Sequence, residues 1–174
     1  MSSIHVIQNT SLSDVALDIH FNAAVLTICN RLWPGGYDVS LAAPETYEEL
    51  VAHLDAGGRM VVYSGGSEQT IYGDLEVNFA FRAWHDWCHW RGRFDFSHEG
   101  ERAACAMQGD HLVALYGESS QTRRWRHILQ AEIIGQREFF DRHGAFPEDQ
   151  RAFVAAYLAD HSSNAALETY QATL

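Results

Sequence analysis

The sequence predicts a mainly α-helical protein with a single domain over residues 1–174, a bundle of five or six helices with one small β-hairpin. Apolar residues recur at helical spacing in several stretches, and residues that start or stop helices bound each stretch. The stretch RMVVYSGGSEQTIYG instead combines β-branched and aromatic residues around a Gly-Gly turn. The length suits one domain with its own core, and no Pro/Gly/Ser-rich linker divides the chain.

The first two helices end at glycine-rich stop signals. Ser11 or Ser13 is expected to cap a helix that runs to about Trp33, where Pro34 and two glycines end it. Its apolar residues occur on nearly every side, as expected of a buried central helix. A shorter helix fits residues 45–58, after a proline and up to two glycines.

The hairpin is expected within residues 59–73. Its two apolar arms flank Gly65 and Gly66, and a Gly-Gly pair between two such arms is typical of a tight hairpin turn. The sequence therefore predicts two antiparallel strands here.

Further helices are expected after the hairpin. Asp74 and Ser97 suit the capping positions of two of them, because short polar side chains accept hydrogen bonds from the first turn. Gly144 ends the longest helix, and Pro147 begins the last one at a first-turn position. These helices are expected over residues 74–91, 97–116, 121–143 and 147–160.

The helix over residues 74–91 contains the segment FRAWHDWCHW, in which titratable residues lie among tryptophans. At about 100° per residue, one sector of about 60° collects four polar residues, Asn78, Arg82, His85 and His89. Asp86 lies just beyond the edge of this sector. The rest of the circumference is apolar, so the helix must be largely buried and its polar stripe is expected to line an interior cleft.

The neighbouring helices offer polar partners for this stripe. On the next helix, Glu101 and Gln108 share one face with small residues that allow another helix to approach closely. On the longest helix, Glu132 and Gln136 share a face with apolar residues. An unpaired buried carboxylate is costly, so both glutamates call for a cation, a proton or a metal.

His85 and His89 have the spacing of two ligands to one metal ion. Histidines at i and i+4 place their imidazoles on one helix face, and a carboxylate such as Glu101 completes three ligands with a fourth position left for water. A divalent metal ion, with zinc as the expected element, is thus the predicted cofactor. Two other residues are alternatives to Glu101 as the third ligand. One is Glu132; the other is Asp95, because HDWCHWRGRFD also matches H-[DE]-x-x-H-x-x-G-x-x-[HD].

The predicted chemistry is hydrolysis of a small-molecule or peptide substrate by a metal-activated water. Asp86 occupies the general-base position of an H-E-x-x-H helix, although its side chain is one methylene shorter. Arg82 or Asn78 is expected to stabilise developing negative charge. Glu132 is either a further metal ligand or the partner of Arg82. A buried polar network without metal, which fixes the register of the helices, is the structural alternative.

The composition excludes several classes of function. A net charge of −11 repels a phosphate backbone, so duplex nucleic acid is not expected as a partner. No apolar run reaches about 18 residues, and MSSIHVIQNT lacks the blocks of a signal peptide, so a cytoplasmic protein without a membrane partner is expected. Three cysteines without a C-x-x-C pair predict neither a disulfide framework nor a cysteine zinc site.

The run FRAWHDWCHW, followed by FDFSHEGERAACAMQ, resembles an uncharacterised family of bacteriophages and mobile elements with the pattern F-R-A-x-H-D-x-x-x-H, then Phe, then G-E-x-x-A. The similarity covers residues 78–108, with a weaker match at EIIGQ in 132–136. It implies a phage-encoded protein in the host cytoplasm, without an established activity. The H-D-x-x-H element is also similar to that of zincin peptidases. The resemblance assigns His85, Asp86, His89 and Glu101 to the family pattern, although His89 lies one residue before the pattern's second histidine, a position that is Trp90 here.

Two rival functions fit the same sequence. In an HD-type nucleotide phosphohydrolase, His85 and Asp86 would form the metal-binding core, with His53 upstream and Asp141 downstream as further ligands. This interpretation leaves His89 unused. The non-enzymatic rival is an acidic phage protein that binds and inhibits a host protein, with the His and Glu cluster serving only the fold.

Overall fold

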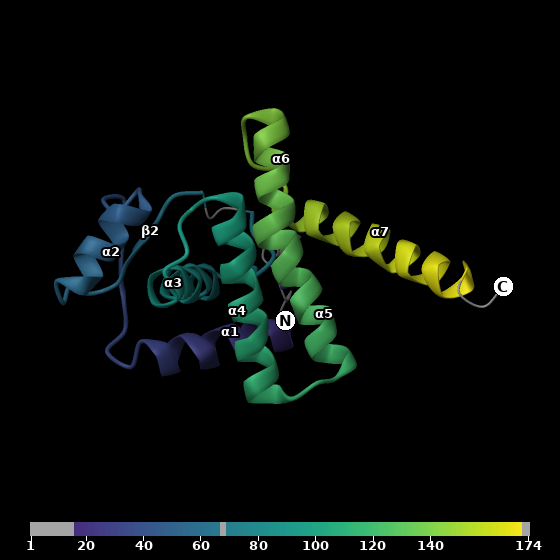
Figure 1. Cartoon of the computed structure of the whole chain (residues 1–174), viewed down its shortest axis with the longest axis horizontal. Helices are drawn as coiled ribbons and strands as arrows, with labels where there is room; N and C mark the ends of the chain where they lie inside the picture. The colour runs from purple at the N-terminus through teal and green to yellow at the C-terminus, as the bar shows by residue number, and fades with distance from the viewer. Residues whose placement is uncertain (1–15, 67–68, 172–174) are drawn as a thin grey trace, which may run out of the picture.

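The computed structural model describes residues 16–66 and 69–171, with side chains described as far as residue 160. This part of the chain is mainly helical with one small β element, which confirms the predicted fold class (Figure 1). Helix α3 (Leu75–Gly92) is central: it contacts α1 (Ile19–Leu32), α2 (Tyr47–Asp55), α4 (His98–Tyr116) and β2 (Val61–Tyr63). Helix α7 (Gln150–Gln171) packs against the segment η2 (Ala131–Gly135) and then extends away from the rest of the molecule. Among the described residues, no helix is long and apolar enough to cross a bilayer.

Helix α1 (Ile19–Leu32) begins after Asp18, whose backbone is extended and whose carboxylate accepts hydrogen bonds from the amides of His20 and Phe21 at 3.0 Å each. The predicted caps Ser11 and Ser13 lie outside the described residues. Within the described part of the chain, the helix therefore starts later than the sequence indicated, because the carboxylate of Asp18 satisfies the free amides of its first turn.

The β element differs from the predicted hairpin. Strand β1 (Asp38–Ser40) pairs in parallel with β2 (Val61–Tyr63), and α2 (Tyr47–Asp55) forms the crossover between them. Parallel strands require such a crossover, whereas a two-residue turn joins only antiparallel ones. The expected second arm forms no strand: within residues 69–73, the carbonyl of Ile71 accepts from Leu17 N at 2.7 Å and that of Tyr72 from the side chain of Asn22 at 2.8 Å. The hairpin prediction was thus wrong.

Helix α3 (Leu75–Gly92) matches its prediction. Asp74 caps its first turn, and Arg93 ends it in the left-handed conformation with φ 56°. Trp84 and His89 are both 0% exposed, so the helix lies inside the protein as its apolar circumference indicated. This burial carries the polar stripe of α3 into the interior.

The later helices also follow the prediction, with one irregularity. Helix α4 (His98–Tyr116) is capped by Ser97. The expected long helix is continuous but consists of α5 (Ser120–Gln130), the π-helical segment η2 (Ala131–Gly135) and α6 (Gln136–His143). Such π segments often occur at functional sites. Helix α7 (Gln150–Gln171) begins after Asp149, whose carboxylate accepts from Ala152 N at 2.8 Å. Pro147 therefore lies before this helix and not, as was predicted, in its first turn, because Asp149 caps the helix, which also extends past the predicted end at residue 160.

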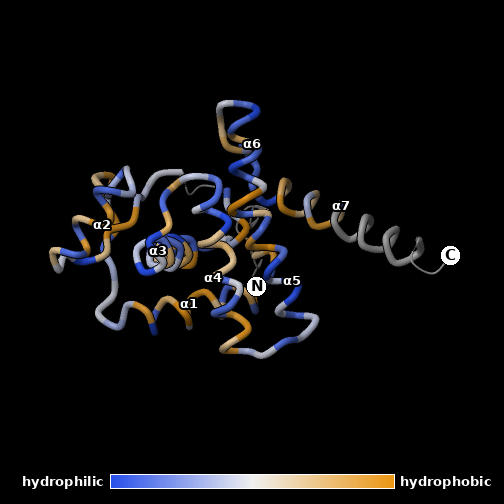
Figure 2. The backbone as a smooth tube through the Cα atoms, viewed as in Figure 1, coloured by the Kyte–Doolittle hydropathy of each residue, from blue (hydrophilic) through white to orange (hydrophobic). Residues whose placement is uncertain are grey.

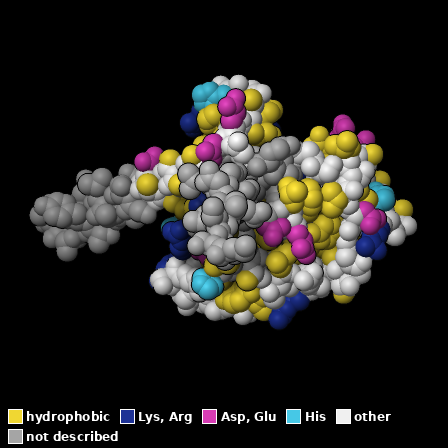
Figure 3. All heavy atoms as spheres, turned by 180° about the vertical axis from the view of Figure 1, so that it is seen from behind, with side chains coloured by type: hydrophobic (Ala, Val, Ile, Leu, Met, Phe, Trp, Pro, Cys, Tyr) yellow, Lys and Arg dark blue, Asp and Glu magenta, His cyan; other side chains and the backbone are white. Residues whose placement is uncertain are grey.

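The surface is mixed in character. Helix α6 is hydrophilic along most of its length, while α1 is largely hydrophobic and packs against α3 (Figure 2). On the face seen in Figure 3, the arginines among the described residues occur in small separate groups between acidic and hydrophobic side chains. The charges of this face are therefore dispersed.

Gly100, in the first turn of α4, allows α4 to begin close against the preceding loop. A methyl group there would overlap the backbone carbonyl of Asp95, which cannot rotate aside as a side chain can. We expect Gly100→Ala to lower the free energy of unfolding by about 1–3 kcal/mol, measured by urea denaturation.

Gly109→Ala, in the same helix, is the matched control. There the added methyl meets the flexible side chain of Arg126 at 3.3 Å, so stability should stay unchanged or rise, because alanine favours helix over glycine. Equal losses in both variants would show that the loop does not constrain the start of α4.

Candidate metal-binding site

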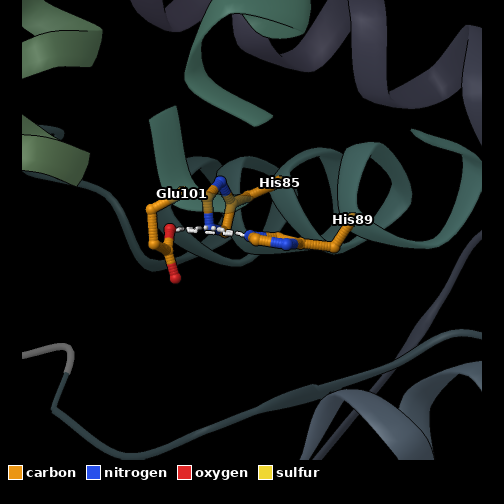
Figure 4. A group of neighbouring side chains, drawn as sticks. All are labelled: His85, His89 and Glu101. Atoms are coloured by element: carbon orange, nitrogen blue, oxygen red, sulfur yellow. Dashed lines mark hydrogen bonds and ion pairs between the residues drawn. The ribbon is translucent and has the colours of Figure 1, made fainter. Parts of the chain in front are cut away.

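Three side chains converge between α3 and α4 (Figure 4). His85 and His89 lie one turn apart on α3, and their Nε2 atoms are 3.0 Å from each other. Oε2 of Glu101, in the first turn of α4, lies 3.2 Å from Nε2 of His85 and 3.5 Å from Nε2 of His89. The structure thus brings together the three residues that the sequence indicated as ligands, in a group that could hold a metal ion.

The loop between α3 and α4 sets the position of Glu101. The carboxylate of Asp95 accepts hydrogen bonds from the backbone amide and the hydroxyl of Ser97, and the hydroxyl of Ser97 accepts from Gly100 N at 3.2 Å. These bonds start α4 with its first turn against α3. Asp95 is exposed, and its carboxylate already accepts the hydrogen bonds from Ser97. The structure therefore does not place Asp95 as the alternative third ligand.

The Nδ1 atom of each histidine, which faces away from Glu101, has its own hydrogen-bond partner. Nδ1 of His89 lies 2.9 Å from the carbonyl oxygen of Phe94, and Nδ1 of His85 lies 3.0 Å from Oε1 of Gln108. A carbonyl only accepts, so Nδ1 of His89 carries the proton and a neutral ring has its lone pair on Nε2. The same logic holds for His85 with Oε1 of Gln108. Both lone pairs are then directed at the point that Glu101 also faces.

The dimensions of the group suit a metal ion. A tetrahedral zinc ion with bonds of about 2.0–2.1 Å places its ligand atoms about 3.3 Å apart. The three ligand atoms here are separated by 3.0, 3.2 and 3.5 Å. Three acceptor atoms this close repel one another unless a proton or a cation lies between them. Histidines that bind metals in proteins also usually donate a hydrogen bond to an oxygen atom from the ring nitrogen that does not bind the metal.

The same proximity shifts the acidity of the group. Burial favours the neutral carboxyl of Glu101, but hydrogen bonds from His85 and His89 outweigh it and hold the pKa of Glu101 well below its usual range. Burial opposes a charge on His85 as well, yet the bond to Glu101 raises the pKa of His85 overall. Without metal, a proton on His85 can therefore offset the charge of Glu101. A metal must displace that proton when it binds.

A pocket of about 420 Å³ adjoins the group. His85 and Glu101 form part of its wall, together with residues of the loop after β2, of α3, of η2 and of the start of α7. The other lining residues are Tyr63, Gly65, Gly66, Asn78, Phe81, Arg82, Glu132, Ile133, Gln136, Arg137, Phe146 and Gln150. Two of the three candidate ligands, His85 and Glu101, are thus accessible to a small molecule.

Glu132 lines this pocket but lies outside the group of three candidate ligands. It accepts a hydrogen bond from the side chain of Gln136 at 2.7 Å. Burial raises the pKa of Glu132 to about 8, although the bond from Gln136 favours the charged form. Its carboxyl is therefore mainly protonated at neutral pH.

Arg82 lines the same pocket and is bound to the loop after β2. Its guanidinium donates to the carbonyls of Tyr63, Gly65 and Gly66 at 2.6, 2.7 and 3.0 Å. Among the described residues it forms no ion pair with Glu132 within 4.0 Å. Arg82 thus fixes the loop that forms one wall of the pocket.

Asn78 and Asp86 have different positions relative to the pocket. Asn78 is buried and lines it, as its place on the polar stripe indicated. Asp86 is partly buried beside His85 but is not among the lining residues of this pocket. Burial raises the pKa of Asp86, against the attraction of both histidines. The role of Asp86 as a general base stays a prediction.

The residues required by the HD-type interpretation lie elsewhere. Nε2 of His53, in α2, lies 2.7 Å from the carbonyl oxygen of Arg59. Asp141, in α6, pairs with His98 at 2.9 Å and with Arg137 at 3.3 Å. Neither belongs to the group around His85, so the structure does not assemble the HD-type site.

Some features of the site were not found by sequence reasoning. The carbonyl of Phe94 is a backbone group in a loop, and no side-chain pattern indicates it. Gln108 was assigned to the correct face, but its contact with His85 was not foreseen. Arg137 and Phe146 are separated from the motif by several elements, and only the fold brings them to the pocket.

No protein-family model matches this chain, and neither a curated protein nor a solved structure similar to it was found. The resemblance to a phage family therefore stays a prediction.

The raised pKa of Glu132 leads to a pH-dependent stability. An unfolded glutamate ionises near pH 4.3, whereas Glu132 in the folded protein ionises at about 8. Between these values the folded state binds the extra proton, so its stability falls as pH rises, by up to about 1.4 kcal/mol per pH unit. Glu132→Gln keeps an acceptor for Gln136 and removes this titration.

Urea unfolding of the metal-free proteins measures the difference. The two proteins should be most alike near pH 5, and the variant should become progressively more stable than the wild type up to about pH 8. A stability difference that stays constant over this range would show that Glu132 ionises normally in the folded state.

Proposed function

We propose that His85, His89 and Glu101 bind one divalent metal ion, with zinc as the best match, and that the protein is a hydrolase acting on a substrate held in the adjoining pocket. Two imidazole nitrogens and one carboxylate oxygen are a ligand set typical of catalytic zinc. The observation that carries the proposal is the 3.0 Å approach of two Nε2 atoms whose rings are both anchored through Nδ1.

The open side of the group favours a catalytic role over a structural one. Structural zinc sites are closed by four protein ligands, whereas catalytic sites keep a position for water. Here the group has three protein ligands among the described residues, and two of them, His85 and Glu101, form part of the pocket wall. A purely structural ion would not need this access.

The residues of the pocket can be assigned roles in hydrolysis. A bound zinc ion lowers the pKa of its water to about 7, which supplies a nucleophile at neutral pH. Glu132, in the same pocket and with a pKa near 8, is suited to transfer a proton to or from the reacting group. Asn78 lines the wall of the pocket, and Arg82 keeps the loop after β2 in place.

Metal analysis of the purified protein tests the proposal. We expect about one zinc ion per chain in the wild type and less than about a tenth of that in His85→Ala, His89→Ala and Glu101→Ala, because two protein ligands hold zinc poorly. His98→Ala is the matched control: this exposed histidine also lies beside a carboxylate, Asp141 at 2.9 Å, but outside the group. It should retain the full metal content.

Wild-type protein that is folded but contains no metal, even after incubation with zinc, would contradict the proposed metal site. That result would favour a non-enzymatic binding protein. Metal-loaded protein can then be assayed with peptides, nucleotides and phosphodiesters. Turnover that needs the metal and is lost in Glu132→Gln supports the hydrolase. Full metal occupancy without turnover of any of these substrate classes counts against it.

Gln108 provides a second test, of how the ligands are oriented. Its Oε1 faces His85, while its buried amide nitrogen has no hydrogen-bond partner among the described residues. Gln108→Leu should therefore weaken zinc binding by about 10–100-fold, without destabilising the metal-free protein. Competition with a coloured chelator measures the affinity. Unchanged affinity would show that Gln108 does not orient His85.

A further inference from the structure

The charges around the pocket differ from those of the whole chain. The chain carries −11, yet the pocket wall contains two arginines, Arg82 and Arg137. Of the two acidic residues in this wall, Glu101 faces the histidines, and Glu132 has its pKa raised by burial to about 8. With a divalent ion bound, the pocket is positive at neutral pH. A positive pocket in a low-dielectric wall attracts anions.

The two arginines are not equivalent. Arg82 uses its terminal nitrogens for three backbone carbonyls, so it contributes charge but has few donors left for a ligand. Arg137 pairs with Asp141 through Nε, at 3.3 Å. The two terminal nitrogens of Arg137 are thus outside that contact, and they form the fork with which a guanidinium binds two oxygens of one anion.

The pocket brings Arg137 and two of the candidate ligands into one wall. Arg137 comes from α6, whereas His85 and Glu101 come from α3 and α4. A molecule that fills the pocket therefore borders both the candidate metal-binding group and the guanidinium of Arg137.

Building on the proposed function, we propose that the substrate carries an oxyanion, a phosphate or a carboxylate, and that Arg137 binds this group in the pocket next to the metal. Arg137 is then a binding residue, and its pair with Asp141 through Nε leaves both terminal nitrogens for the anion. Neutral substrates of the same size should bind less well.

Inorganic phosphate and acetate, each titrated into protein loaded with cobalt(II), test the proposal. The visible spectrum of the ion reports binding beside it, and calorimetry gives the affinity. We expect Arg137→Gln to weaken the binding of the preferred anion by about tenfold or more. Stronger binding of phosphate than of acetate would identify a phosphate ester, and the reverse order a carboxylate.

Two variants on α6 separate this role from a structural one. Arg142→Gln removes the same charge from an exposed arginine that pairs with Glu138 and does not line the pocket, so anion binding should change less than about twofold. Asp141→Asn removes the ion pair but keeps Arg137, so anion binding should be retained. A loss of binding in all three variants would show that only the charge or fold of α6 matters, and would overturn the proposal.

The metal content of the same samples separates the two proposals. Two results at full metal occupancy would overturn the role of Arg137 and leave the metal site intact. In one, the wild type and Arg137→Gln bind each anion with the same affinity; in the other, neither protein binds phosphate or acetate. Protein that takes up no metal, but binds an anion only when Arg137 is present, would overturn the hydrolase and support the anion site alone.

Discussion

The close approach of the imidazoles of His85 and His89 depends on contacts at the far side of each ring. The carbonyl of Phe94 fixes one ring and the amide of Gln108 the other, so that both Nε2 atoms face Glu101. The cost of placing three acceptor atoms together in a largely buried position is high unless a cation or a proton joins them. The packing of α3 against α4 therefore depends on what occupies this point.

The surrounding fold makes the arrangement both rigid and accessible. Helix α3 is buried between α1 and α4, so its histidines have little freedom to turn away. The loop after β2, held by Arg82, and the segment η2 line the pocket that His85 and Glu101 border. In many binding sites, regular elements hold the ligand-binding side chains in place while loops form the wall of the adjoining pocket.

The sequence predicted the helices and the three candidate ligands because their signals are local. Caps, glycine stops and the i, i+4 spacing of His85 and His89 are visible in short windows, and the face of Glu101 follows from helical periodicity. The parallel pairing of β1 with β2 was missed because three-residue strands have almost no pattern, and a Gly-Gly pair favours a hairpin. The π-helical segment was missed because AEIIG has ordinary helical composition. The contact with Phe94 was missed because backbone carbonyls have no sequence signature.

Anomalous scattering at the zinc absorption edge, from crystals of the protein prepared with zinc, tests the occupant of this group most directly. The account predicts one peak about 2.0–2.2 Å from Nε2 of His85, from Nε2 of His89 and from a carboxylate oxygen of Glu101. Crystals with zinc in excess, in which these side chains keep their positions with only hydrogen bonds between them and no peak, would contradict it.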